Sequence, residues 1–596
     1  MSASPRLICF CLALVVFQMA LISTAQTSYS GSPNQRHCAD LDGHEEPCPT
    51  PVPNQPVRSD ASTGKEASAP GILHYGSTYI PLDSWMYPVI ERLAGQGVIK
   101  IAFFGLRPWT RVAVYQMLQG VDESGLDSFS ATLVASLKAE LRREEQLDLG
   151  QPSKAARIDK IYERTQSVSG KPLNASFNFG QTIADDFGRP YGQGWQQLVG
   201  FRNRAEAGRF ALFVSGEYQH SPSIPGYSSS IAKVIAVQDS TPVQSYPGTG
   251  AGNTFRLLDT YVSMHLLGND FSVGKQTYWW GPGDGSAMML SNNAVPFYSL
   301  RINRTTPLRV PLLSRLLGPM RYDNFFGQLT EHNFPPRPFF WGQKISFRPS
   351  ENLELGFSRD AVFAGEGVSP LTFGNFFHSF FSTTSGTCAG CSLRENPGAR
   401  HGNFDFRYRI PGLRNWLTLY TDSLVHDDPS PLDAPRRAAV TPGIYLARFP
   451  GISKLDLHVE GGTTDTVTSR AKGGQFYYYQ SIYKDGYTNK GYLLGSWLGR
   501  EGTGGKAWAT YWFSPKSFVQ VGYKTLTVSP YFVPQGETQK AAYVNVRRSW
   551  QSGMTLQLFV QGERWAAPVL APTPQVDITA QLQISYNSKN WTLVRH

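Results

Sequence analysis

Apolar and polar residues alternate along most of the chain, from about residue 166 to the C-terminus. The alternation is clearest at 211–218, 455–460, 554–561 and 576–585. Because successive side chains of a β-strand point to opposite faces, each run predicts a strand with one apolar and one mostly polar face. This pattern is typical of a soluble antiparallel sheet as well as of a membrane barrel.

Three features favour the membrane barrel. The strands recur over about 430 residues without a helical segment, and the chain begins with an export signal. Many segments begin or end with aromatic residues, at 278–280, 339–341, 477–479 and 508–513. Such rings are typical of the girdles at a membrane surface, and a closed barrel leaves no unpaired backbone in lipid. At roughly 24 residues per strand with its connection, residues 166–596 predict an all-β antiparallel outer-membrane barrel of about 18 strands.

Residues 77–165 show a different pattern, with apolar residues at helical spacing. The spacing predicts one helix at 85–93, a second that begins at Thr110, a good N-cap residue, and a third from about Ser128. The third helix runs into the charged residues 142–145, which we expect to form its solvated end. These elements predict a small helical domain in front of the barrel.

The first 25 residues have the features of a signal peptide. A weakly basic start precedes an apolar run at 7–22, and small residues follow at 23–25. An uncleaved anchor helix is the alternative interpretation. Residues 26–76 are rich in Pro, Ser, Asn and Gln, which predicts an extended, disordered linker.

The composition agrees with a β-rich membrane protein. Hydrophobic types make up 41% of the 596 residues, aromatic types 13% and charged types 17%. The many aromatic residues exclude a disordered chain, and an ordinary soluble domain carries about 25% charged residues. Beyond the leader, no apolar stretch reaches the roughly 18 to 20 residues of a membrane-spanning helix. The net charge of +10, about +9 without Arg6 of the leader, favours an acidic partner.

The cysteines outside the leader predict two local disulfides, because they form two close pairs in an exported chain. The pairs are Cys38 with Cys48 and Cys388 with Cys391. A redox dithiol is an alternative for the second pair. A zinc site would need two further ligands, such as His378 and His401. We predict neither a metal site nor a cofactor.

Catalytic signatures are absent, whereas residue types that bind sugars are frequent. The chain has no His-Glu-x-x-His helix and no Gly-x-Ser-x-Gly turn. Aromatic rings can stack on the apolar faces of sugars, and amides, carboxylates and guanidinium groups can bind their polar groups. The candidate polysaccharide-binding residues are Trp279, Trp280, Asp284, Asn292, Asn293, Arg301, Arg359, Glu366, Asp485, Tyr487 and Asn489. The structural alternatives are a membrane girdle for the tryptophans, turns for the glycine-rich segments, and a local ion pair for Arg359.

Five segments together resemble Wzi-type capsule assembly proteins, a family of outer-membrane lectins that tether capsular polysaccharide to the cell surface. The segments are 79–85 (YIPLDSW), 105–110 (GLRPWT), 280–294 with its WGPG and SNNA motifs, 353–359 (LELGFSR) and 485–495 (DGYTNKGYLLG). The resemblance covers about residues 77–596. It implies an 18-stranded barrel with a periplasmic helical domain at its base, a lumen obstructed by loops, and no catalysis.

These observations predict a protein of a Gram-negative-type outer membrane that binds an acidic capsular or extracellular polysaccharide and retains it at the cell surface. We expect contacts with membrane lipid, a link to polysaccharide export machinery through the helical domain, and no nucleic acid. A porin or sugar channel is the main alternative. A hydrolase is another, and its carboxylates would come from Asp284, Asp323, Glu366 or Asp485, which the sequence cannot place in space.

Overall fold

The computed structural model describes residues 74–588, apart from 152, 383–395, 414–415, 429–431 and 433–434. All of these residues belong to one compact unit, 71–596. The predicted signal peptide, nearly all of the predicted linker, and both predicted disulfides (Cys38–Cys48 and Cys388–Cys391) lie outside the described residues.

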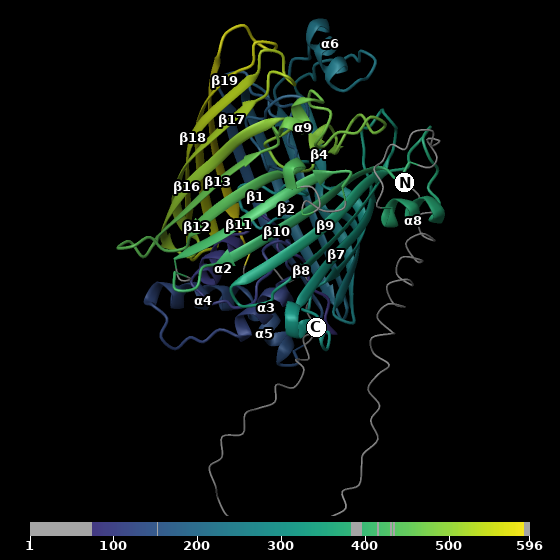
Figure 1. Ribbon diagram of the computed structural model, residues 1–596. Coiled ribbons are helices and arrows are strands. Elements are labelled where there is room, and N and C mark those ends of the chain that lie inside the picture. The colour runs from purple at the N-terminus through teal and green to yellow at the C-terminus, as the bar shows by residue number, and fades with distance from the viewer. Residues whose placement is uncertain are drawn as a thin grey trace, which may run out of the picture. The chain divides into compact units, whose positions relative to one another are not determined.

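Eighteen antiparallel strands form one closed barrel (Figure 1). Each strand pairs with its neighbours in the sequence, and β1 (Ala155–Val168) closes the barrel against β20 (Gln575–Tyr586). The other barrel strands are β2 (Gly194–Ala207), β3 (Phe210–Ser221), β4 (Gly252–Leu266), β5 (Asn269–Gln276), β6 (Phe297–Arg304), β7 (Met320–Gln328), β8 (Phe339–Phe347), β9 (Leu353–Phe363), β10 (Ala399–Arg409), β11 (Leu417–His426), β12 (Ala439–Leu446), β13 (Leu455–Thr463), β16 (Gly502–Ser514), β17 (Ser517–Val528), β18 (Glu537–Ser549) and β19 (Met554–Ala566). The predicted fold class and strand number are confirmed.

The alternating pattern places apolar side chains on the outside of the barrel and polar side chains on the inside. In β20, Val576 and Ile578 point outward and are 66% and 54% exposed, whereas Asp577 and Thr579 point inward and are at most 1% exposed. The outer surface therefore presents a continuous apolar wall of the kind that faces lipid. Within the described residues, no helix has both the length and the apolar character needed to cross a bilayer.

The first strand begins at Ala155, before the boundary that the sequence predicts at residue 166. Polar residues at outward positions of β1, such as Glu163 and Thr165, remove the apolar-and-polar contrast that identifies the later strands. The segment therefore has no clear period of two in the sequence, although it pairs with both β2 and β20.

Among the residues that the structure describes, four helices precede the barrel, where the sequence predicts three in the same region. They are α2 (Met86–Gly95), α3 (Arg111–Gln119), α4 (Ser128–Glu140) and α5 (Arg142–Asp148). The Thr110 side chain caps α3 by accepting a hydrogen bond from the Ala113 N–H at 3.2 Å. The solvated end predicted at 142–145 is wrong for Glu144, because a new helix begins at Arg142 and buries Glu144 against Arg111, whose Nε donates to it at 2.6 Å.

The two ends of the barrel differ in the length of their connections. At the turn end, short links such as 208–209 and 515–516 join the strands, and α2–α5 lie here (Figure 1). Arg348 in the link after β8 donates to the Ala102 carbonyl at 2.6 Å, and Lys516 lies 2.8 Å from Glu140. The opposite, loop end has long connections, and Figure 1 shows α6 and α9 there.

The connections contain several shorter elements. They are α6 (Ser229–Gln238), α7 (Leu313–Leu317), α8 (Phe373–Phe381), the 3-10 helix η3 (Pro435–Arg437), α9 (Val467–Arg470), β14 (Thr488–Asn489) and β15 (Tyr492–Leu493). Of these, only α7 lies in a turn-end connection, between β6 and β7.

Candidate functional site

Two loop-end connections fold into the barrel and fill its loop half. These are 277–296, between β5 and β6, and 464–501, between β13 and β16. Their buried apolar side chains form one cluster with inward-facing rings of the strands, which includes Tyr278, Trp280, Met288, Tyr478, Tyr487, Phe297, Phe325 and Phe340. Phe103 and Leu106 join this cluster from the turn end. We call this set of packed loops and rings the plug.

The plug changes the interpretation of two aromatic segments. The girdle that the sequence predicts is wrong for 278–280 and for 477–479, since both lie inside the barrel and all of these rings are at most 6% exposed. By contrast, Tyr511 and Phe513 on β16 point outward and are 37% and 51% exposed. Ring-to-ring packing in the lumen and ring exposure at the membrane surface therefore produce the same sequence signal.

Asparagines at candidate positions join the loops of the plug. The Asn293 side chain donates to the Leu493 carbonyl at 3.2 Å and accepts from the Asp185 N–H at 3.1 Å. Asn489 donates to the Val295 carbonyl at 2.8 Å. Both asparagines are at most 1% exposed, so their hydrogen-bonding capacity is used within the protein.

Trp280 and Arg301 share one buried partner, Asp323. The Trp280 indole donates to this carboxylate at 3.1 Å, and Arg301 forms two hydrogen bonds with it at 2.6 and 2.8 Å. The Arg301 guanidinium also lies 4.5 Å from the Tyr79 ring and 4.6 Å from the Tyr278 ring. This candidate pair therefore belongs to the interior of the plug.

Arg359 and Asp360 point to opposite sides of the wall, because they are consecutive residues of β9. Asp360 faces the lumen, where it contacts His401 at 2.9 Å and accepts a hydrogen bond from Tyr487. Arg359 faces outward and donates to the Phe380 carbonyl at 2.8 Å. The local ion pair considered for Arg359 is therefore absent.

The remaining loop candidates lie nearer to the surface. Glu366 is exposed and lies 3.2 Å from Arg337, which is exposed too. The Asp485 carboxylate accepts hydrogen bonds from the N–H groups of Asn333 and Phe334 at 2.7 and 2.6 Å and so holds the link between β7 and β8.

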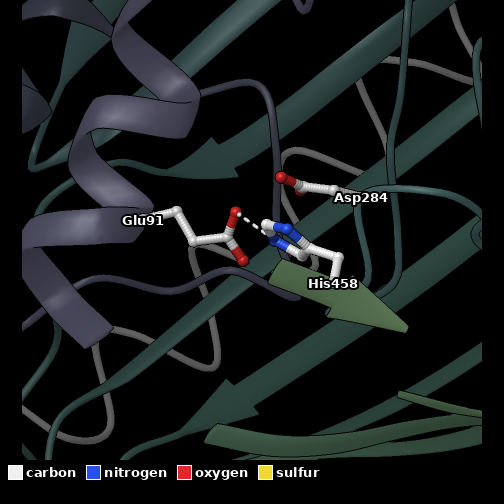
Figure 2. A group of neighbouring side chains, drawn as sticks. All are labelled: Glu91, Asp284 and His458. Atoms are coloured by element: carbon white, nitrogen blue, oxygen red, sulfur yellow. Dashed lines mark hydrogen bonds and ion pairs between the residues drawn. The ribbon is translucent and has the colours of Figure 1, made fainter. Parts of the chain in front are cut away.

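Below the plug, Glu91, Asp284 and His458 meet at a junction of three parts of the protein (Figure 2). Glu91 lies on α2, Asp284 on the inward-folded loop and His458 on β13, and their nearest oxygen and nitrogen atoms lie within 4.8 Å of one another. His458 contacts Glu91 at 3.2 Å, and its ring stacks between Tyr445 and Trp508 at centroid distances of 4.1 and 4.6 Å.

The junction has the residue types of a metal site, but each of its two carboxyl groups already pairs with an arginine. Arg407 binds Glu91 at 2.9 Å, and Arg107 binds Asp284. Although burial opposes ionisation, His458 and Arg407 hold the pKa of Glu91 well below its usual range. Burial and the Glu91 charge raise the pKa of Asp284 to about 7. A divalent cation would lie beside two guanidinium groups, so the arrangement suits a link between α2, the loop and the wall.

A cavity of about 490 Å³ adjoins the junction inside the turn half of the barrel. It brings together three of the candidate residues, Trp279, Asp284 and Asn292, with residues that the sequence analysis did not select, such as Glu91 and His458. The only signal for His458 was the polar face of the strand at 455–460, and Glu91 lies on a helix that the sequence identifies through its apolar residues alone.

The exposed charges of the loop end are mainly positive. Among the described residues of the loop-end connections, six exposed cations face two exposed anions, Glu331 and Glu366. The cations are Lys233, Arg337, Arg436, Arg470, Lys472 and Lys490. We call this exposed surface the loop face. None of its cations was singled out from the sequence, because isolated lysines and arginines in loops carry no motif.

Comparisons with known proteins agree with the closed barrel. The family described as capsule assembly protein Wzi matches residues 163–580. A Klebsiella pneumoniae protein described as uncharacterized, of 55.8 kDa and in the cps region, is 26% identical over 183 residues, and the match covers 30% of this chain and 34% of that protein. The chain thus spans about a third of the length of this relative.

Among solved structures, an Escherichia coli outer-membrane protein is similar in fold. It is described as Wzi, involved in group 1 capsule assembly and a carbohydrate-binding β-barrel, and the match has a TM-score of 0.62, 18% identity, and coverage of 87% of this chain and all of that chain. The Pseudomonas aeruginosa protein OpdK matches with a TM-score of 0.39 and 12% identity over 72% of this chain and 98% of its own. The sequence resemblance predicted this family. Because the family match covers most of the chain, this chain belongs to the capsule assembly protein Wzi family.

Proposed function

We propose that this protein binds an acidic capsular polysaccharide on its loop face and so holds the polymer at the outer surface of the cell. The main support for the proposal is the excess of exposed cations on the loop face, which lies above a filled lumen. Membership of a capsule assembly family supports it, as does the similar fold of a barrel described as carbohydrate-binding.

The charges of the loop face suit a long polymer better than a compact ligand. Lys233, Arg436 and Lys472 come from three different connections and form no ion pair with the described residues. Separate cations can each bind one acidic unit of the same chain. Single contacts of this kind are weak and screened by salt, but repeated contacts along one polymer add through avidity.

Tyr531 adds an aromatic surface beside two of these cations. Its side chain is 69% exposed in the link between β17 and β18. A Cβ placed on Gly473 would lie 3.2 Å from the Tyr531 carbonyl oxygen, so this link contacts the segment that contains Arg470 and Lys472. A sugar ring that stacks on Tyr531 would place its acidic groups near these side chains.

The filled lumen supports retention at the surface over passage through the barrel. The alternative of a porin or sugar channel requires a continuous water path, whereas the plug packs loops, wall and turn-end residues in one core. Short turns face the periplasm in outer-membrane barrels. The proposal therefore places α2–α5 in the periplasm, where they could contact export machinery.

A binding assay at several salt concentrations tests the proposal. The purified full chain in lipid nanodiscs is titrated with polygalacturonate, together with the variant Lys233→Gln/Arg436→Gln/Lys472→Gln. Three exposed charges at about 0.5 kcal/mol each correspond to a loss of about tenfold in affinity at low salt. Arg448→Gln, an exposed cation of the turn end, is the matched control and should bind like wild type. Equal affinity of wild type and the triple variant would contradict the loop-face assignment.

A further inference from the structure

The outer wall carries a pair of cations directly opposite each other near the loop end. Lys540 on β18 is in register with Arg564 on β19, and both side chains point outward and are exposed. Lys540 lies near the start of β18 and Arg564 near the end of β19, where both strands meet loop-end connections. The pair is therefore part of the wall, separate from the loop face.

Two like charges at opposite positions of an antiparallel pair destabilise it unless an anion lies between them. Neither Lys540 nor Arg564 forms an ion pair within the described part of the chain. A cation on the lipid-facing side costs about 2–4 kcal/mol at the middle of the bilayer and close to zero at its surface. The position of the pair at the loop end therefore places it at the level of the lipid headgroups.

The wall below the pair changes from charged to small to apolar residues. The next outward pair towards the turn end is Ala542 with Gly562, followed by Val544 with Val560. A Cβ placed on Gly562 would meet no atom within 4 Å, so the surface beneath the cations is open. Val544 and Val560 are exposed apolar residues of the lipid-facing wall.

We propose that Lys540 and Arg564 form a binding site for a phosphorylated lipid of the outer leaflet. The lipid phosphate lies between the ammonium and guanidinium groups, and an acyl chain runs over Ala542 and Gly562 onto the apolar wall. Guanidinium and ammonium groups are the usual protein partners of phosphate. The cations adjoin the apolar wall. A lipid therefore fits this surface better than a free anion or the polysaccharide, because only a lipid has both a charged group and an acyl chain.

Thermal unfolding of the purified full chain tests this site. Lipid A with its phosphates intact and lipid A without phosphates are added in detergent, and unfolding is followed by the gel shift between folded and unfolded barrel. We expect the phosphorylated lipid to raise the unfolding temperature of wild type and the dephosphorylated lipid to raise it much less. Lys540→Gln/Arg564→Gln should lose most of this increase. Arg548→Gln, which removes a single outward cation at the turn end of β18, should keep it.

Two results would overturn the proposal. One is an equal rise of the unfolding temperature with phosphorylated lipid A in the double variant and in wild type, provided that the double variant still shows the folded band without lipid. The other is protection of wild type by polygalacturonate that the double variant loses, because this would assign the cations to the polymer. Native mass spectrometry of the same samples checks the first result independently, since the double variant should retain fewer lipid A molecules than Arg548→Gln.

Discussion

The plug and the loop face contain similar residue types but use them in opposite ways. In the plug, Trp280 and Arg301 both bind Asp323, and the asparagine at 293 joins two loops. On the loop face, Lys472 forms no ion pair with the described residues, and Tyr531 is 69% exposed. Aromatic and charged side chains thus stabilise a closed lumen in one region, whereas an aromatic ring and cations such as Lys472 remain exposed to a ligand in the other.

This difference shows that residue type alone does not identify a sugar-binding site in a barrel. A buried ring or guanidinium group must have partners inside the protein, because a buried polar group without a hydrogen bond is costly. Whether such a side chain is available to a ligand depends on whether its loop folds into the lumen or stays above it. Variants in each region test this division between plug and loop face.

The largest effect is expected from Arg301→Met, which leaves Asp323 as an unpaired buried charge. Breaking a buried ion pair costs about 3–5 kcal/mol, so the variant should unfold at a clearly lower temperature in the gel-shift assay. Arg337→Met is the control, because its pair with Glu366 is exposed. If the two variants lost the same stability, the structural role assigned to the plug would be wrong.

A smaller effect is expected in the pH dependence of folding stability, because of Asp284. Because its pKa is raised to about 7, the folded protein keeps a proton that the unfolded chain has already lost above its ordinary value of 3.8. Stability present at low pH is therefore lost as the pH rises from about 4 through 7. Asp284→Asn removes this titration, and its denaturant midpoint should vary less over this range. A parallel pH dependence in the variant and wild type would exclude Asp284 as the source.

Tyr531→Ala should weaken polysaccharide binding by about 0.5–1.5 kcal/mol, up to roughly tenfold, since aromatic contacts contribute this much. The fold should be unaffected, because the ring is mostly exposed. Tyr531→Phe keeps the ring and should retain most of the affinity. Titration with polygalacturonate measures the affinity of wild type and both variants. Loss of binding in the phenylalanine variant would show that the hydroxyl, and not the ring, makes the contact.

The smallest effect is expected from Glu366→Gln. Its ion pair with Arg337 is solvent-exposed, and such pairs contribute little to stability. The variant should unfold like wild type, and its polymer affinity should be equal or slightly higher, because one exposed anion is removed. A clear loss of affinity would instead support Glu366 as a direct sugar contact, the role that its residue type suggests.

The fold could be predicted because the membrane imposes a strict pattern. Within the bilayer, outward positions of a barrel strand face lipid and inward positions do not, so strands such as 576–585 have a clear period of two. The prediction failed where polar residues at outward positions obscured the contrast, as with Glu163 and Thr165 in β1. It also failed at Glu144, because a charged cluster can begin a new helix as well as end one.

The site could be predicted only in part, because a loop sequence does not say on which side of the barrel mouth the loop lies. The aromatic segment 278–280 fits a membrane girdle, a sugar platform and a packed lumen equally well. Asp284 was selected as a possible ligand, but its partners Glu91 and His458 lie 193 and 174 positions away along the chain. The loop-face cations were missed because their proximity exists only after folding.

Photo-crosslinking of bound polymer tests the central claim most directly. A photoreactive side chain replaces Val467, which is 82% exposed next to Arg470 on the loop face, or Leu149, which is 77% exposed beyond α5 at the turn end. Each purified protein is irradiated in nanodiscs with polygalacturonate at low salt. Polymer should attach at position 467 and not at position 149. Attachment at 149 alone, or at neither position while binding is retained, would contradict polysaccharide binding on the loop face.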